Sequence, residues 1–157
     1  MRHRDVLAAR GATLFERTLA YLFDALLTFL LWIAVILSVA RDPDRLTDDA
    51  AYALIAGMLF LVVPFTYFVL LEGLTGTTPG KAMLGLRIVN NEGRPAGLFA
   101  ATVRNTLRLA WALGPVGPAF LLLDVVLIQN GENDRRLGDA AAETRVVRSR
   151  RGLLALD

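Results

Sequence analysis

Five charged side chains lie within or next to segments that are otherwise apolar enough for a membrane. Asp24 and Asp124 each interrupt an apolar run, Arg104 and Arg108 lie ahead of Asp124 in the same region, and Arg17 directly precedes the run of Asp24. A charge left in lipid costs at least about 2.5 to 3.5 kcal/mol, so such residues often mark ion paths, substrate paths and proton relays. The same charges are satisfied if both aspartates simply neutralise the arginines and hold the helices in register. Both interpretations stand at this point.

The composition argues against most catalytic and metal sites. The chain has no cysteine, and its one histidine, His3, lies in a charged N-terminal tail, so thiolate sites, histidine metal clusters and Ser-His-Asp triads are excluded. Neither serine, Ser38 or Ser149, has a base nearby in the sequence. We therefore predict that the chain is not an enzyme and that it has no catalytic residue, cofactor site or metal site.

Two apolar segments are long enough to cross a bilayer. Residues 18–39 contain Asp24 as their single charge, and residues 50–71 are uncharged up to Glu72. About 20 apolar residues cross the roughly 30 Å of hydrocarbon. A cleaved signal peptide is disfavoured for the first segment, because its apolar region would span about 7 to 15 residues and would rarely contain an acid. The sequence therefore predicts two spanning helices.

A third apolar region, residues 98–129, is broken by glycine and proline between Gly114 and Pro118. If this region turns back at the break, fifteen of the seventeen Lys and Arg residues lie on one side of the membrane, whereas a single crossing divides them nine to eight. The positive-inside rule favours the first arrangement. We predict a helix–break–helix hairpin that is re-entrant or thins the bilayer locally, both termini in the cytoplasm, and an outer turn at residues 41–49.

This topology predicts that the charges meet. Arg17 lies two helical turns before Asp24, and Arg104 and Arg108 share one helix face. Asp124 is expected at the depth of Asp24, near the cytoplasmic boundary. We predict one polar cluster of Asp24, Asp124, Arg104 and Arg108, with Arg17 leaning toward Asp24.

The polar segment before the third region carries signals for short elements. Thr77 or Thr78 is predicted to cap a short helix with Pro79 in its first turn. Residues 86–96 are predicted to form a small β-hairpin around Asn91-Glu92-Gly93. The predicted fold class is an all-α integral membrane protein of two spanning helices plus a Gly/Pro-broken helical hairpin, with a small cytoplasmic β-hairpin between them.

Three sequence elements, taken in order, resemble the RDD family of bacterial membrane proteins. They are ERTLAYLFDALL in the first span, TPGKAMLGLRIVNNEGRP after the second, and NDRRLGDAAAETRVV near the end. The family is named for one arginine and two aspartates, and the resemblance places these at Arg17, Asp24 and Asp139, with Gly80 and Lys81 in the T-P-G-K element. One departure is that AAAET follows Asp139, where family members more often read closer to L-A-G-T, so the next turn lacks its usual glycine.

The resemblance implies candidate functional residues and a location. The candidates are Arg17, Asp24 and Asp139, supported by Asp124, Arg104, Arg108, Gly80 and Lys81. Asp139 either caps a helix, as a solvated side chain, or closes the site. The implied location is the bacterial cytoplasmic (inner) membrane, with several passes. Transport of unidentified ligands has been proposed for this family, and some members are linked to sodium/proton antiport.

Two functions compete on this evidence. The first is transport of ions or small ligands, such as cation/proton exchange, which requires an oligomer because two spans and a hairpin are too few to line a path. The alternative is a non-catalytic membrane scaffold or assembly factor, whose basic cytoplasmic face binds anionic lipids or a membrane-protein partner. Nucleic acid is not expected, because the arginine-rich tail has no interleaved aromatic residues. The expected division is a cytoplasmic tail at 1–15, an RDD-like membrane domain at 16–147 and a basic cytoplasmic tail at 148–157.

Overall fold

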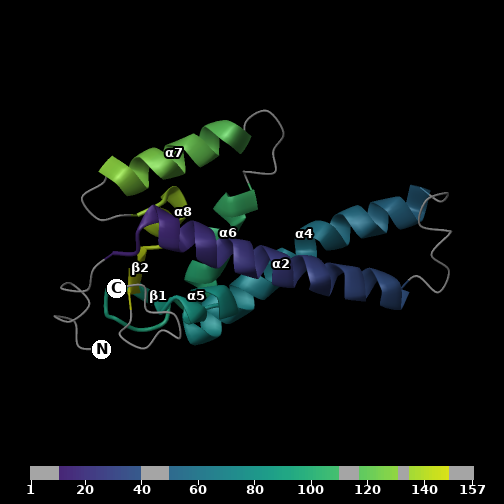
Figure 1. Cartoon of the computed structure of the whole chain (residues 1–157), viewed down its shortest axis with the longest axis horizontal. Coiled ribbons are helices and arrows are strands. Elements are labelled where there is room, and N and C mark those ends of the chain that lie inside the picture. The colour runs from purple at the N-terminus through teal and green to yellow at the C-terminus, as the bar shows by residue number, and fades with distance from the viewer. Residues whose placement is uncertain (1–10, 40–49, 110–116, 131–134, 149–157) are drawn as a thin grey trace.

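Two long helices form the body of the molecule, whose computed structural model describes residues 11–39, 50–109, 117–130 and 135–148. They are α2 (Leu14–Val39) and α4 (Ala50–Thr75), each of 26 residues, or about 39 Å at 1.5 Å per residue. Among the described residues, these two helices are long and apolar enough to cross a membrane. Many of their large apolar side chains are exposed, as a lipid environment permits. Figure 1 shows both helices extending away from the rest of the chain.

Both helices run beyond the predicted spans because polar residues determine where they end. α2 begins before the apolar run, since Thr13 and Glu16 form a reciprocal cap with N···O distances of 2.8 and 3.3 Å. α4 continues through Glu72 and stops at Gly76, whose φ of 70° ends the helix while its N–H donates to the Glu72 carbonyl at 3.1 Å.

Aromatic contacts join α2 to α4. Tyr21 stacks on Phe68 with centroids 6.2 Å apart, and Trp32 meets Phe60 edge-on at 5.4 Å. The indole N–H of Trp32 also donates to the Ala56 carbonyl at 3.0 Å, which ties the helices together in the half that lies away from Glu72. Offset and edge-on ring pairs are favourable beyond their buried area, so the two spans have specific contacts of their own.

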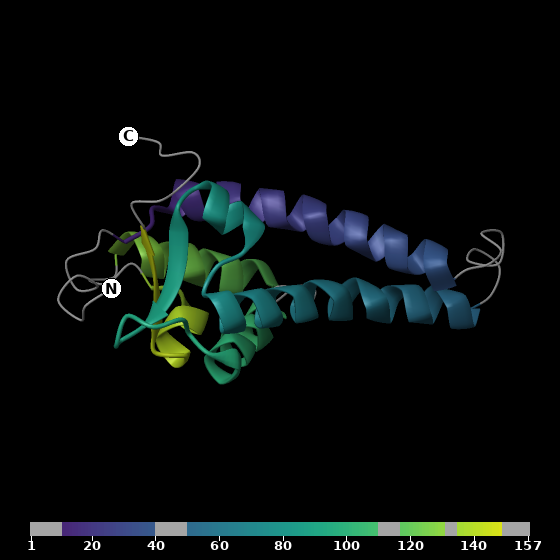
Figure 2. The ribbon, with the colours of Figure 1, turned by 90° about the horizontal axis from the view of Figure 1, so that it is seen from below.

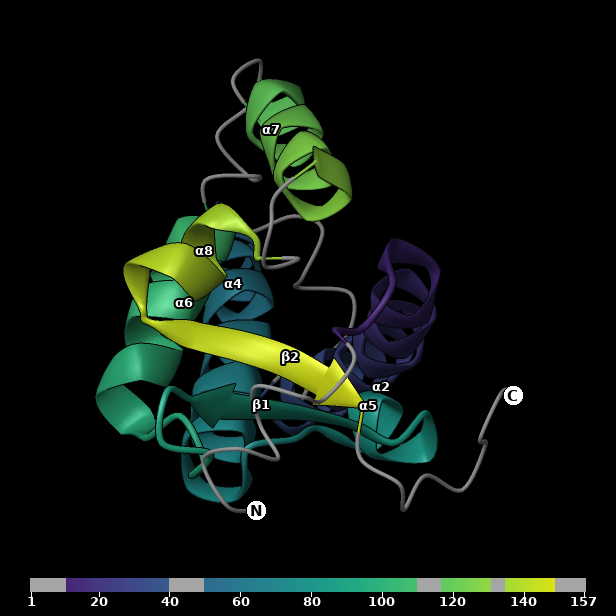
Figure 3. The ribbon, with the colours of Figure 1, turned by 90° about the vertical axis from the view of Figure 1, so that its left-hand side faces the viewer.

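Two short helices and two strands form a cap at one end of the long helices, and the cap repeats one plan twice. Each unit is a helix of 5 residues followed by a strand of 5 residues: α5 (Pro79–Met83) with β1 (Leu86–Asn90), and α8 (Leu137–Ala141) with β2 (Thr144–Arg148). The turn inside each unit holds a residue with positive φ, Gly85 at 68° and Glu143 at 51°. The strands pair antiparallel with Ile88 opposite Val146, as Figure 3 shows. The two units are therefore joined to each other by the pairing of their strands.

The sequence prediction for the cap was partly right. Thr78 caps α5 and Pro79 lies in its first turn, as predicted. The β-hairpin predicted over residues 86–96 is right for its turn but wrong in extent, because β1 pairs along its length with β2 from far along the chain. Only the turn of that hairpin forms: Asn90 and Arg94 are joined by a 2.9 Å backbone hydrogen bond, and Val89 makes a single bridge to Pro95.

The third apolar region contains two separate helices, α6 (Leu98–Leu109) and α7 (Gly117–Asn130). The predicted break falls largely on residues 110–116, which lie outside the described residues, and Pro118 belongs to the first turn of α7. α6 packs against α4 and α8, and Gly73 of α4 permits the close approach of Leu98. The membrane depth of both helices stays a prediction.

The start, middle and end of the described chain meet at the cap. Gly11 bridges Val147, and the Ala12 N–H donates to the Val146 carbonyl at 3.1 Å. A small apolar core lies there, made of Ala12, Ala20, Leu84, Leu86, Ile88 and Val146. The C-terminal end of α2 and the N-terminal end of α4 lie at the opposite end of the molecule (Figure 2). This is the arrangement that a turn-back of the third region requires, while the membrane side that the cap faces stays a prediction.

The closest approach in the fold gives a test of this packing. A Cβ at Gly80 would lie 2.2 Å from the Ala20 carbonyl oxygen, whereas a Cβ at Gly57 would meet nothing within 4 Å. We expect Gly80→Ala to push α5 off α2 and to cost about 1–3 kcal/mol. Gly57→Ala should be neutral or stabilise α4 by up to about 1 kcal/mol. Thermal unfolding in detergent measures both, and equal melting temperatures would contradict the packing.

Candidate functional site

A buried arginine on α6 connects two acids that come from different helices. Arg104 donates through Nε to Glu72 Oε2 of α4 at 3.3 Å, and its Nη1 lies 2.6 Å from Asp139 Oδ1 of α8. The same Nη1 also reaches the Thr144 hydroxyl at 3.0 Å. The three charged side chains are at most 2% exposed. Arg104 therefore places α4, α6 and α8 relative to one another.

Glu72 is shared by three cations and an amide. Lys81 Nζ lies 2.7 Å from its Oε1, and Arg108 Nη2 lies 3.6 Å from the same atom. Asn105 Nδ2 donates to Oε2 at 3.1 Å, alongside Arg104. A fully buried carboxylate needs this many partners to offset the loss of water. The sequence analysis missed Glu72 as a site residue, although an acid at the end of an apolar run shortly before the chain's single lysine was a usable signal.

Asp139 pairs with three arginines and caps its own helix. Arg17 Nη1 of α2 lies 2.8 Å from Oδ2, which also accepts from the Arg136 backbone N–H at 3.3 Å. Burial by itself raises the pKa of the Asp139 carboxyl, but the guanidinium groups of Arg104, Arg136 and Arg17 outweigh it and lower the pKa to about 2. Asp139 therefore caps α8, one of the alternatives that the sequence left open, and it is buried and ion-paired rather than solvated.

Asp24 lies in a separate and uncharged set of donors, which corrects the predicted lean of Arg17 toward it. Its Oδ1 accepts from the Tyr67 hydroxyl and the Gly80 N–H, each at 2.9 Å, and its Oδ2 accepts from the Thr78 hydroxyl. Tyr67 lies on α4, Gly80 lies on α5, and Thr78 is the N-cap residue of α5. Arg17 instead turns toward Asp139. The reason is geometric, because the approach of Gly80 to α2 brings the start of α5 within reach of Asp24.

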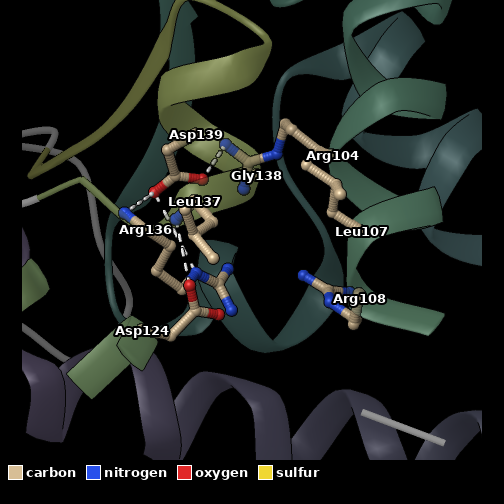
Figure 4. A pocket seen from close by; sticks show the side chains of 8 residues that line it. All are labelled: Arg104, Leu107, Arg108, Asp124, Arg136, Leu137, Gly138 and Asp139. Atoms are coloured by element: carbon tan, nitrogen blue, oxygen red, sulfur yellow. Dashed lines mark hydrogen bonds and ion pairs between the residues drawn. The ribbon is translucent and has the colours of Figure 1, made fainter. Parts of the chain in front are cut away.

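Asp124 and Asp139 face one small cavity beside α6, together with Arg104, Arg108 and Arg136 (Figure 4). Asp124 Oδ1 accepts from the Leu137 backbone N–H at 2.9 Å. The cavity holds about 20 Å³, which is room for about one water molecule. The predicted cluster of four charges is therefore correct for Asp124, Arg104 and Arg108 and wrong for Asp24.

Cations outnumber acids in this network. Five basic side chains, Arg17, Lys81, Arg104, Arg108 and Arg136, lie around the three carboxylates Glu72, Asp124 and Asp139. Burial lowers the pKa of the Lys81 ammonium to about 8; the positive charges of Arg108 and Arg104 add to this and Glu72 opposes it. In the described part of the chain, no three Asp, Glu, His or Cys side chains converge in a way that would hold a metal ion. The excess of positive charge suits an anion better than a cation.

A model of the RDD family matches residues 11–143. The matched stretch contains Arg17, Asp24, Gly80, Lys81 and Asp139, the residues that carried the resemblance in the sequence. No curated protein and no solved structure matches the chain.

Removing the shared carboxylate should leave several buried cations without their partner. We expect Glu72→Gln to cost about 3–5 kcal/mol, because Lys81 and Arg108 lose their acid and Arg104 keeps only one. The matched control is Glu92→Gln, since Glu92 and Arg94 form an exposed pair at 3.5 Å that is worth less than about 1 kcal/mol. Thermal unfolding in detergent compares the two, and similar losses would show that burial of Glu72 carries no special cost.

The lowered pKa of Lys81 predicts that the stability of the protein depends on pH. Its pKa is about 8 in the folded protein against an ordinary value of 10.5. The unfolded chain therefore binds more protons between these two values, so stability rises with pH across this window. We expect the melting temperature of the wild type to rise relative to that of Lys81→Met from about pH 8 to about pH 10. Parallel pH profiles for the two proteins would contradict the shift.

Proposed function

The chain belongs to the RDD family, and from this we propose that it serves as a non-catalytic membrane scaffold in which buried charges hold the cap on two spanning helices. The observation that carries the proposal is the saturation of its carboxylates by the chain's own donors. Asp24 accepts three hydrogen bonds, Glu72 is shared by four side chains, and Asp139 pairs with three arginines. Carboxylates held in this way fix the helices in position relative to one another.

Cation/proton exchange, the other hypothesis, receives less support from the same contacts. A transported cation would have to displace a buried guanidinium from Asp139 or Glu72 in a network where cations already outnumber acids. The cavity between Asp124 and Asp139 has room for about one water molecule. Exchange would therefore need a second copy of the chain to complete a path.

The scaffold proposal also assigns a place and partners. The protein lies in the bacterial cytoplasmic membrane with both termini and the cap in the cytoplasm. There the basic face of the cap binds anionic lipid and a second membrane protein or a second copy. Support comes from exposed arginines on the cap, including Arg87 on β1 and Arg94 in the following turn, which are suited to anionic surfaces.

The first experiment separates scaffold from exchanger. Purified protein is reconstituted in vesicles that contain a pH-sensitive dye, and sodium or potassium gradients are applied. We expect proton flux no greater than in protein-free vesicles, because Asp24, Glu72 and Asp139 are already held by several donors each. A cation-dependent flux that disappears in Asp24→Asn or Asp139→Asn would overturn the proposal in favour of exchange.

The second experiment tests for a partner on the cap. A photocrosslinking residue is placed at Arg87, and at Met58 on the lipid-exposed surface of α4 as the control. We expect a discrete adduct in native membranes from position 87 and none from position 58. Absence of any adduct at 87, together with unchanged abundance of Arg17→Ala, would count against a scaffold that depends on the charge network.

A further inference from the structure

An apolar groove of about 500 Å³ runs between α2 and α4 and ends at α6. Its apolar part includes Phe29 and Trp32 on α2 and Phe60 on α4, and Phe29 and Phe60 are about half exposed. At the end nearer the cap, the groove is lined by Asn105 and Arg108 of α6. Ligand sites between helices have this size and this combination of apolar walls with few polar groups.

The polar end of the groove has hydrogen-bonding capacity that the chain does not use. The Arg108 guanidinium lies over Phe68 at 4.2 Å and reaches Glu72 through Nη2, while its buried Nη1 has no hydrogen-bond partner among the described residues. Asn105 is 2% exposed and donates to Glu72 and to the Ala101 carbonyl, while its Oδ1 accepts no hydrogen bond within the described part of the chain. Buried polar atoms without partners are rare and costly. One cationic donor and one neutral acceptor are therefore available side by side.

The charge at this end selects the class of ligand. Glu72 is already shared by Lys81, Arg104 and Arg108, so the surroundings of Arg108 carry an excess of positive charge. An oxyanion satisfies a guanidinium, whereas the Asn105 Oδ1 needs a hydroxyl or another donor. A head group that contains both a phosphate and a hydroxyl group meets both requirements.

The length of the groove fits an extended apolar chain. From Tyr21 to Trp32 the helix rises about 16 Å, and the groove follows α2 over this stretch. An acyl chain is slim enough to lie in it.

We propose that this groove binds an acyl chain of an anionic phospholipid with a hydroxylated head group, whose phosphate pairs with Arg108 and whose hydroxyl donates to Asn105. The lipid reaches the site sideways from the bilayer, because α2 and α4 are long and apolar enough to lie in it. The side chains of Arg108 and Asn105 shift slightly to present their unused atoms. The proposal goes beyond the scaffold function and holds for either role of the chain.

The test uses Trp32 as a reporter inside the groove. Trp111→Phe leaves Trp32 as the single tryptophan of a chain that has two. The protein is placed in phosphatidylcholine nanodiscs with equal small fractions of brominated phosphatidylglycerol or brominated phosphatidylcholine. We expect severalfold stronger quenching of Trp32 by the brominated phosphatidylglycerol. Arg108→Gln should abolish this preference, and Glu92→Gln, which removes an exposed charge in the turn after β1, should keep it.

A second variant keeps the test valid if Arg108→Gln fails to fold. Ala25→Phe fills the groove without changing charge, because Ala25 lines it, and Ala53→Phe adds the same ring at an exposed position of α4. We expect loss of quenching by the anionic lipid in the first and not in the second. Equal quenching by both lipids, or a preference that Glu92→Gln also removes, overturns the proposal. Absence of quenching by either lipid, with a crosslinked dimer through α2, would assign the groove to a second copy and overturn it as well.

Discussion

The fold depends on a buried arginine that must be neutralised where it lies. Arg104 is nearly inaccessible to solvent and meets Glu72 on one side and Asp139 on the other. Removing a guanidinium from water is costly unless its partners are close and well oriented, so α8 has to sit where Asp139 reaches α6. Arg17 binds the same aspartate from α2, and α2 is thereby connected to the other helices. Two carboxylates thus fix the mutual positions of α2, α4, α6 and α8.

Glycines at the helix contacts make these ion pairs possible. Gly80 lies against Ala20 of α2, and Gly138 lies against the backbone of Arg104 in α6. Each belongs to a helix of 5 residues that leads into a strand, and the two units meet through β1 and β2. The chemistry of the two units differs: near Gly80, Asp24 is satisfied by neutral donors, whereas next to Gly138, Asp139 is satisfied by arginines. The same helix–strand arrangement therefore holds Asp24 with neutral donors and Asp139 with charged donors.

The scaffold function and the lipid site are proposed from opposite sides of the same buried charge network. Toward the cap, the carboxylates are saturated and the cavity is small, which suits a rigid connection between membrane helices and a polar face. Toward the bilayer, Arg108 and Asn105 keep unused polar atoms at the end of an apolar groove. The excess of cations over carboxylates explains both observations. It supplies partners for the carboxylates, and it leaves positive charge that an anion can neutralise.

The sequence by itself determined the local features. Apolar length predicted both long helices, Thr78 and Pro79 predicted the start of α5, and the missing glycine after Asp139 falls where Glu143 takes a positive φ. The family followed from short motifs in the right order. These features depend on neighbours a few residues apart, whose geometry is set by the backbone of one element.

Only the tertiary structure decided which charges meet and which strands pair. Arg17 and Asp24 share a helix face, yet Arg17 pairs with Asp139 because α8 approaches it and the start of α5 approaches Asp24. β1 pairs with β2 rather than with its own continuation, since α5 and α8 anchor both strands at the same end of the long helices. Glu72 became central only once α5 and α6 had brought three cations to it. Spacing along one helix fixes the face on which a side chain lies, whereas the partner it meets there depends on helix contacts between distant parts of the chain.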